Sequence, residues 1–218
     1  AVLAAREVKP KHAERVPPRA GQRVSAPPVF LRSAVFDIEC MKLYGAGDVP
    51  GHMICCCILP LDTDEVMTYA LRFEDQRDDR RLLEEVIGSL SGFQILIGHN
   101  IARFDLNWLY TRAVFYGLPP LPTWFYYDTY SAAQRLALNV RKSMAELGDF
   151  LRLNNGSMAK TAVHTTSWGD IDSPDRAVFE AALANVVDHC QRDVMLNRAV
   201  FNELWKYDVG KKFGKTKW

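Results

Sequence analysis

Residues 33–40 read Ser-Ala-Val-Phe-Asp-Ile-Glu-Cys, a short apolar run that contains two acids. The run is rich in β-forming residues and predicts a strand. Side chains two positions apart in a strand point to the same face, so Asp37 and Glu39 are expected to lie side by side. Such a pair in an apolar strand repels unless a cation neutralises it, and hard oxygen ligands favour Mg²⁺ or Mn²⁺. A strand end that exposes two solvated acids is the alternative.

The chain around this strand alternates between further strands and helices. Apolar runs predict strands over 53–59, 66–71, 93–97 and 124–127. Helical spacing predicts helices over 82–90, 104–116, 129–138, 143–152 and 175–206. Strands close in sequence form antiparallel pairs, whereas a strand that follows a helix joins the sheet in parallel. The expected fold class is therefore α/β, with a mixed five-stranded sheet of three antiparallel and then two parallel strands, flanked by helices.

The length and composition are those of one soluble globular domain. A chain of 218 residues can bury one sizeable core but is short for two domains with a linker. Hydrophobic residues make up 48% and charged residues 24%, which excludes wholesale disorder, collagen and coiled coil. No apolar run approaches the roughly 18 residues of a membrane span, so no membrane partner is expected.

The net charge of +1 conceals an uneven distribution along the chain. Residues 1–30 hold six basic residues against two acidic ones, with five prolines, and are interpreted as an extension or linker that also resembles part of an organelle transit sequence. Residues 206–218 hold five basic residues against one acidic, so 207–218 are predicted to be a basic tail. The body, 31–206, is acidic. Each basic end is either a solvated tail or a contact for nucleic-acid phosphates.

The number and spacing of the cysteines indicate whether the protein occurs in an oxidising or a reducing compartment. There are five, an odd number without a C-x-x-C pair, which fits neither a disulfide framework nor a zinc knuckle. Three of them, Cys55 to Cys57, lie in an apolar run where a thiol acts as a small hydrophobic group. We expect free thiols and a reducing intracellular compartment, the cytoplasm, the nucleus or an organelle.

A second polar segment, Gly98-His-Asn-Ile-Ala-Arg-Phe-Asp105, turns from a strand end into a helix. Asn100 could cap that helix, and an acid such as Asp105 in a first turn favours the helix dipole. His99 and Asn100 also stand at the carboxyl end of a strand, where open α/β sheets place ligands. Both interpretations stay open from the residues alone.

A third segment, Asp188-His-Cys-Gln-Arg-Asp193, lies in the last predicted helix. His189 and Asp193 are four residues apart and are expected to share a helix face. A packed or exposed histidine, or a surface pair with the acid, is the ordinary interpretation of this spacing.

Taken together, the three segments resemble the motifs of the DEDD superfamily of 3′ to 5′ exonucleases, which has the RNase H-like fold. The superfamily includes the DnaQ-type enzymes and the proofreading domains of family A and family B polymerases. Phe36-Asp-Ile-Glu39 matches the first motif and His99 to Asp105 the second, H-N-x-x-x-F-D. The third motif departs from the family forms, Tyr-x3-Asp and His-x4-Asp, because His189-x3-Asp193 places a histidine at the tyrosine spacing.

The resemblance implies a site and a set of partners. Asp37, Glu39, Asp105 and Asp193 would be the four catalytic acids and would hold two Mg²⁺ or Mn²⁺ ions. His189 would orient and deprotonate the attacking water, or else no side-chain base is well placed. The residues that would border the terminal nucleotide are Cys40, Met41, Asn100 and Phe104.

The expected function is a metal-dependent 3′ to 5′ exonuclease that acts on a single-stranded end of DNA or RNA, alone or in a polymerase, replication or repair assembly. One alternative is a catalytically inactive DEDD-fold protein that binds nucleic acid or a protein. Another is an RNase H-like endonuclease.

Overall fold

The computed structural model describes residues 31–41, 51–153, 166–210 and 212–218, which form a six-stranded mixed sheet in the order β3-β2-β1-β4-β5-β6. The strands are β1 (Ser33–Cys40), β2 (Met53–Pro60), β3 (Met67–Ala70), β4 (Ile95–Gly98), β5 (Phe125–Asp128) and β6 (Gly214–Lys215). β1, β2 and β3 pair antiparallel, while β4 and β5 continue the sheet in parallel. The predicted RNase H-like mixed sheet is confirmed. The predicted count of five strands is wrong by one, because β6 has only two residues and no recognisable pattern.

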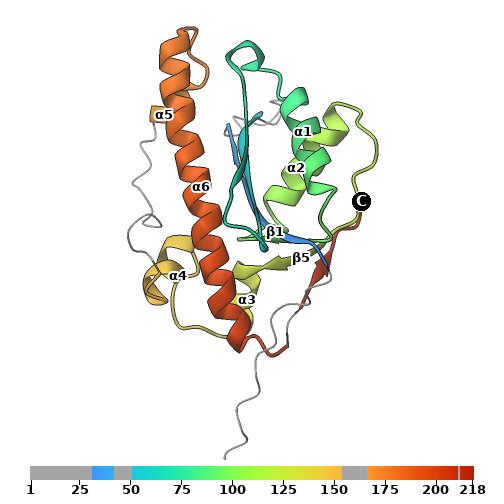
Figure 1. The fold of residues 1–218 in the computed structure, drawn as a ribbon, viewed down its shortest axis with the longest axis vertical. Helices are drawn as coiled ribbons and strands as arrows, with labels where there is room; N and C mark the ends of the chain where they lie inside the picture. Colours follow the sequence, from blue (N-terminus) through green and yellow to red (C-terminus); the bar gives the residue numbers. More distant parts are fainter. Residues whose placement is uncertain (1–30, 42–50, 154–165, 211) are drawn as a thin grey trace, which may run out of the picture.

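Helices cover both faces of the sheet (Figure 1). The long helix α6 (Arg176–Tyr207) lies along one face, and α1 (Arg80–Leu90) and α2 (Asp105–Phe115) lie on the other. The shorter helices are η1 (Phe73–Asp75), α3 (Thr129–Arg135), α4 (Met144–Phe150) and α5 (Thr166–Asp170). Within the described residues, none of the helices combines the length and the apolar character that a membrane crossing needs.

The core lies on both faces of the sheet, under α6 on one side and under α1 and α2 on the other. All eight residues of β2 are buried, which explains its unbroken apolar sequence, since a strand covered on both faces loses the alternation of polar and apolar residues. Its three cysteines belong to this core, and all five cysteines are free thiols as predicted. Asp175, the residue before α6, caps the helix, because its side chain accepts from the Ala177 amide at 2.8 Å.

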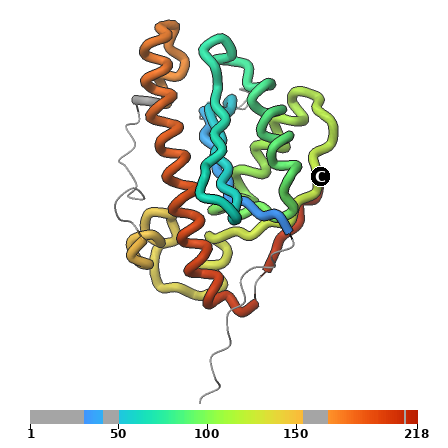
Figure 2. Tube along the Cα trace, in the orientation of Figure 1, coloured from blue at the N-terminus to red at the C-terminus, as the bar shows by residue number. Residues whose placement is uncertain are grey.

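Residues 207–210 and 212–218, part of the predicted basic tail, lie against the body of the protein (Figure 2). β6 pairs antiparallel with β5, and the Asp208 carboxylate accepts from the Tyr127 hydroxyl at 2.9 Å. Gly214 permits this pairing, because a Cβ there would lie 2.0 Å from the Tyr126 ring. The stretch 1–30 lies outside the described residues.

A buried ion pair joins β2, α1 and α2. The Asp79 carboxylate, just before α1, accepts from the Met53 amide at 2.7 Å and from the Tyr116 hydroxyl at 2.8 Å. It also pairs with the guanidinium of Arg112, and both side chains are almost fully buried. Each charge is thereby compensated in the interior, so loss of one partner would leave the other unpaired.

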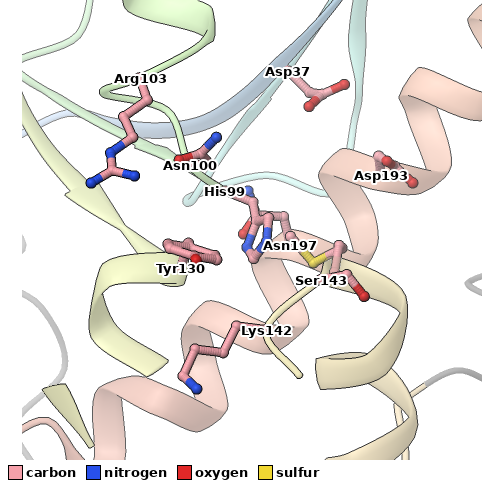
Figure 3. A pocket seen from close by; sticks show the side chains of 10 residues that line it. Asp37, His99, Asn100, Arg103, Tyr130, Lys142, Ser143, Asp193 and Asn197 are labelled. Carbon is pink, nitrogen blue, oxygen red and sulfur yellow. The ribbon is translucent and has the colours of Figure 1, made fainter. Parts of the chain in front are cut away.

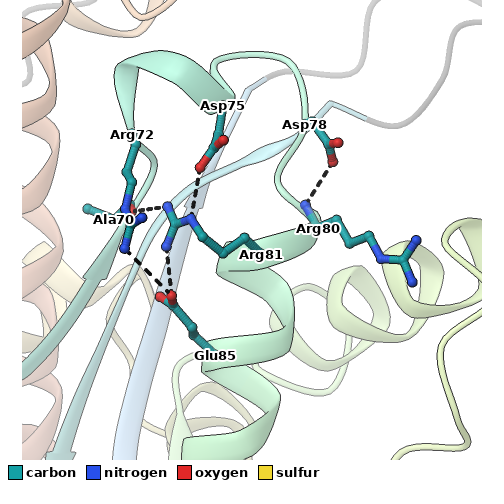
Figure 4. A network of polar contacts seen from close by, with 7 residues as sticks. All are labelled: Ala70, Arg72, Asp75, Asp78, Arg80, Arg81 and Glu85. Atoms are coloured by element: carbon teal, nitrogen blue, oxygen red, sulfur yellow. Dashed lines mark hydrogen bonds and ion pairs between the residues drawn. The ribbon is translucent and has the colours of Figure 1, made fainter.

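A second network, of ion pairs near the protein surface, lies at the start of α1 (Figure 4). Arg81 donates to Asp75 and to Glu85, each at 2.8 Å, and so connects η1 to the first turns of α1. Arg80 pairs with Glu84 one turn along the same helix, at 3.1 Å and with both side chains about half exposed. Solvent weakens these pairs, so they contribute little to stability.

We predict that Arg112→Met destabilises the protein by about 3 to 5 kcal/mol, because it leaves the Asp79 carboxylate buried without its counter-ion. Arg80→Met is the matched control and should cost less than about 1 kcal/mol, since its pair is exposed. Urea unfolding followed by tryptophan fluorescence measures both. Equal losses in the two variants would show that the buried pair has no special weight.

Candidate active site

Asp37 and Glu39 point from β1 toward α6, as their spacing predicts. The Cys190 thiol of α6 lies 3.6 Å from Asp37 Oδ2, and His189 Nε2 lies 3.6 Å from Glu39 Oε1. Both carboxylates are only partly buried, because they stand near the end of the strand. One face of β1 therefore presents two acids to the same stretch of helix.

Asp105 reaches the same strand from the opposite helix layer. β4 pairs with β1 only over residues 33–35, which leaves the next part of that β1 edge without a strand partner. The buried Asp105 carboxylate, at the start of α2, accepts from the Ile38 amide at 3.2 Å and satisfies this edge. Asp105 thus stands beside β1 between the positions of Asp37 and Glu39.

The turn between β4 and α2 requires particular residues at two backbone positions, Gly98 and Asn100. Gly98 lies so close to Ile101 that a Cβ would come within 2.7 Å of that side chain. Asn100 has a φ of 59°, a left-handed conformation that asparagine tolerates better than most residues. Asn100 does not act as the helix cap, because Phe104 occupies that position.

α6 contributes His189 and Asp193 from one face, four residues apart. His189 Nε2 lies 3.7 Å from Asp193 Oδ2 and 3.6 Å from Glu39 Oε1, both longer than a hydrogen bond. His189 is 8% exposed. Its ring is nearly perpendicular to that of Trp168, and the two ring centroids are 5.8 Å apart. The imidazole is therefore held between two carboxylates and an aromatic ring of α5.

Burial and like charge govern the acids. Burial, followed by the charges of Asp105, Glu39 and Asp193, raises the pKa of Asp37 well above its usual range, and the Cys190 thiol opposes this by donating to the carboxylate. Burial raises the pKa of Asp105 to about 7, against the amides that donate to it. Asp37 and Asp105 therefore keep their protons to a higher pH than isolated carboxyl groups do.

The carboxylates suit a divalent cation in charge and in chemistry. Asp37, Glu39, Asp105 and Asp193 supply hard oxygen donors, and their mutual repulsion is what a cation would relieve. Among the described residues, no three His, Cys, Asp or Glu side chains already stand in a ligand arrangement. The acids would thus have to close around an ion, which carboxylates can do by rotating.

A cavity of about 510 Å³ opens beside these acids (Figure 3). Asp37 and Asp193 lie on one side of it, and Arg103 and Tyr130 lie on the other. The remaining lining residues are His99, Asn100, Lys142, Ser143, Met144 and Asn197. The cavity is thus acidic on one side and carries a guanidinium on the other.

The structure brings some of the predicted site residues to this cavity and leaves others elsewhere. Asp37, Asn100 and Asp193 line it, whereas Glu39, Asp105 and His189 stand next to the lining acids. Of the other predicted substrate residues, Cys40 and Met41 lie at the end of β1, and Met41 is buried. Phe104 is exposed and packs on Trp108. These three are not among the residues that line the cavity.

Sequence reasoning missed Asp128, which holds the site together. Its carboxylate caps α3 by accepting from the Tyr130 amide at 3.0 Å and also accepts from the Asn100 amide at 2.9 Å. An acid directly between an apolar strand and a helix is a visible cap signal. Its second contact, across to the β4–α2 turn, has no counterpart in the local sequence.

Asn197 was also missed, although its spacing points to it. It follows Asp193 by four residues on the same face of α6, and its side-chain oxygen lies 3.0 Å from the Thr129 hydroxyl. That hydroxyl lies 3.0 Å from His99 Nδ1, so the three side chains form one polar chain beside the cavity. Arg103, Tyr130, Lys142 and Ser143 carry no pattern that would assign them.

Comparison with known proteins places the fold. No protein-family model matches the chain, and no curated protein matches its sequence. Among similar solved structures is the family B DNA polymerase from the hyperthermophilic archaeon Pyrobaculum calidifontis, with a TM-score of 0.66 and 18% identity. The similarity covers 82% of this chain and 25% of the polymerase chain, so this chain spans about a quarter of that protein's length. At this identity the similarity establishes a shared fold.

We predict that Asp105→Asn stabilises the metal-free protein at pH 8. The pKa of Asp105 in the folded state, about 7, lies above the ordinary value of about 3.9, so the folded state binds a proton more tightly than the unfolded state. Stability therefore falls as pH rises from about 4 to about 7, and the amide removes this loss, worth up to a few kcal/mol at pH 8.

Urea unfolding with a chelator at pH 4 and pH 8 measures this effect. The amide oxygen can still accept from Ile38, so the hydrogen bond is kept. Asp188→Asn, which removes an exposed acid paired with Arg192, is the control for loss of one charge. An Asp105→Asn variant with the pH slope of the wild type would contradict the assignment of a raised pKa.

Proposed function

We propose that this protein is a metal-dependent exonuclease that hydrolyses phosphodiester bonds from the 3′ end of DNA or RNA. The observation that carries the proposal is the convergence of four carboxylates, from β1, α2 and α6, at one strand end beside a cavity. A cluster of like charges that is partly or fully buried is costly and recurs where it has a chemical use.

The fold comparison supports this proposal. One structurally similar protein is a family B DNA polymerase, and the motifs of this chain resemble those of proofreading domains of that polymerase family. A polymerase acts on nucleic acid, which fits a nucleic-acid substrate for this chain. A polymerase or a replication or repair assembly as a partner belongs to the same proposal.

In the proposed mechanism, Asp37, Glu39, Asp105 and Asp193 hold two Mg²⁺ or Mn²⁺ ions. When bound, the ions would neutralise charge on the phosphoryl oxygens and make a water more acidic. His189 would accept the proton of the attacking water from its place between Glu39 and Asp193. The scissile phosphate would then lie on the acidic side of the cavity.

The opposite side of the cavity supports a polyanionic ligand. Arg103 is exposed there, and a guanidinium can donate two parallel hydrogen bonds to a phosphate. Tyr130 stands beside it, edge-to-face with His99 at 5.7 Å, and offers an aromatic surface for a sugar or a base. Lys142 contributes less, because its ammonium donates to the Leu138 and Val140 carbonyls.

We predict that Asp37→Asn and Asp193→Asn each abolish stepwise 3′ shortening of a labelled single strand in Mn²⁺. Each substitution removes a charge from the metal-binding cluster while it preserves side-chain shape. Asp188→Asn, on the same helix but outside the site, is the control and should keep activity. The assay uses 5′-labelled DNA and RNA of equal sequence, and undiminished shortening by Asp37→Asn would overturn the site.

A separate prediction concerns the base. His189→Gln should lower kcat by about 10²- to 10⁴-fold, because an amide cannot accept the proton, while Mn²⁺ affinity stays close to that of the wild type. Rapid-quench measurement of single turnovers, with calorimetric Mn²⁺ titration, resolves the two effects. His52→Gln, a half-buried histidine outside the site, is the control. Near-full activity of His189→Gln would remove this residue from the mechanism.

A non-catalytic nucleic-acid-binding protein on the same fold is the second candidate. It is favoured by the lack, within the described residues, of three metal-ligating side chains in a ready arrangement. Calorimetry separates the two candidates, because the enzyme requires Mn²⁺ binding that Asp193→Asn weakens. Strand binding without any Mn²⁺ binding would support the non-catalytic protein.

A further inference from the structure

Cys190 is the residue of α6 that stands directly against Asp37. Its thiol donates to the Asp37 carboxylate at 3.6 Å and to the Asp37 carbonyl at 3.4 Å. Both separations lie within the range of hydrogen bonds that involve sulfur, whose larger radius lengthens the contact. The thiol is fully buried, so water does not compete for the contact.

Cys190 is the polar member of an otherwise apolar row of side chains on α6. One turn before and one turn after Cys190 on α6 are Val186 and Val194, both fully buried and apolar. This row of side chains packs onto the sheet, where a large polar group would not fit. A thiol is small enough to allow the close approach of α6 to β1 and still supplies one donor.

Two further thiols lie beside Cys190. Cys55 and Cys57 lie opposite Glu39 and Asp37 in the sheet, on the face of β2 that meets α6, and their thiols interact with that of Cys190. Asp37 is therefore bordered by these thiols, while Asp105, Glu39 and Asp193 repel its carboxylate. The carboxylates repel it, and the S–H donor of Cys190 attracts it.

We propose that Cys190 is a positioning residue, whose thiol holds the Asp37 carboxylate in the orientation in which it can bind a cation. The part of this inference that concerns the cation rests on the proposed function. The contact itself belongs to the metal-free protein, where it opposes the repulsion of Asp37 by the neighbouring acids.

The first test compares two buried cysteines. Cys190→Ala removes the donor to Asp37. Cys56→Ala removes a sulfur of equal size from the other face of β2, where the thiol is also fully buried but donates to the backbone carbonyl of Cys57. Calorimetric titration should show Mn²⁺ affinity about tenfold lower in Cys190→Ala, as is typical when a residue that orients a metal ligand is lost. Cys56→Ala should bind Mn²⁺ as the wild type does. Equal affinities in the two variants would overturn the proposal.

Rescue by a conservative variant distinguishes positioning from packing. Cys190→Ser restores an O–H donor and should recover most of the Mn²⁺ affinity lost in Cys190→Ala. Thermal unfolding of all four proteins shows whether each is folded. A serine variant that is folded but binds Mn²⁺ as poorly as the alanine variant would reject the hydrogen bond as the cause.

An infrared measurement tests the contact without any metal. The S–H stretching band of Cys190 is the one that disappears in Cys190→Ala, and Asp37→Asn should shift it to higher frequency because an amide oxygen is a weaker acceptor than a carboxylate. A band that does not move would show that the thiol donates only to the backbone carbonyl of Asp37, and this result would overturn the proposal. If the protein removes no nucleotides, the proposed function fails, while this comparison still decides the role of Cys190.

Discussion

Repulsion among four carboxylates around the end of β1 is the constraint on which the rest of this structure depends. Asp37 stands at its centre, and burial together with Asp105, Glu39 and Asp193 raises its pKa. A domain tolerates such a cluster only if other interactions keep the contributing segments in place. The surrounding architecture supplies these interactions from the sheet and from both helix layers.

Separate interactions hold the segments that surround these acids. β1 continues past the end of its pairing with β4, and Asp105 of α2 fills the gap by accepting from Ile38. Asp128 joins the β4–α2 turn to α3 through one carboxylate. Farther away, the buried Asp79–Arg112 pair ties α2 to β2. Displacement of any of these elements would separate the acids from one another.

The distribution of charge gains a structural meaning. The acidic side of the cavity and the guanidinium of Arg103 face each other across a space of about 510 Å³, an arrangement that suits a ligand carrying phosphates and bound cations together. The near-neutral net charge is the sum of such opposing regions and therefore does not argue against a polyanionic partner. The thiol of Cys190 donates a hydrogen bond to Asp37 without adding a charge to this arrangement.

The sequence alone determined the bounds of β1 and the shared helix face of His189 and Asp193, because these follow from local periodicities of two and 3.6 residues. It also determined the mixed sheet, because the order of strands and helices along the chain decides which neighbours pair antiparallel and which pair in parallel. Only the tertiary structure decided that Gly214 and Lys215 pair with β5 as β6, that Asp128 accepts a hydrogen bond from Asn100, and that Cys190 meets Asp37. It also left Cys40, Met41 and Phe104 outside the cavity lining. These contacts join residues far apart in the chain, and local patterns carry no information about which distant groups packing will bring together.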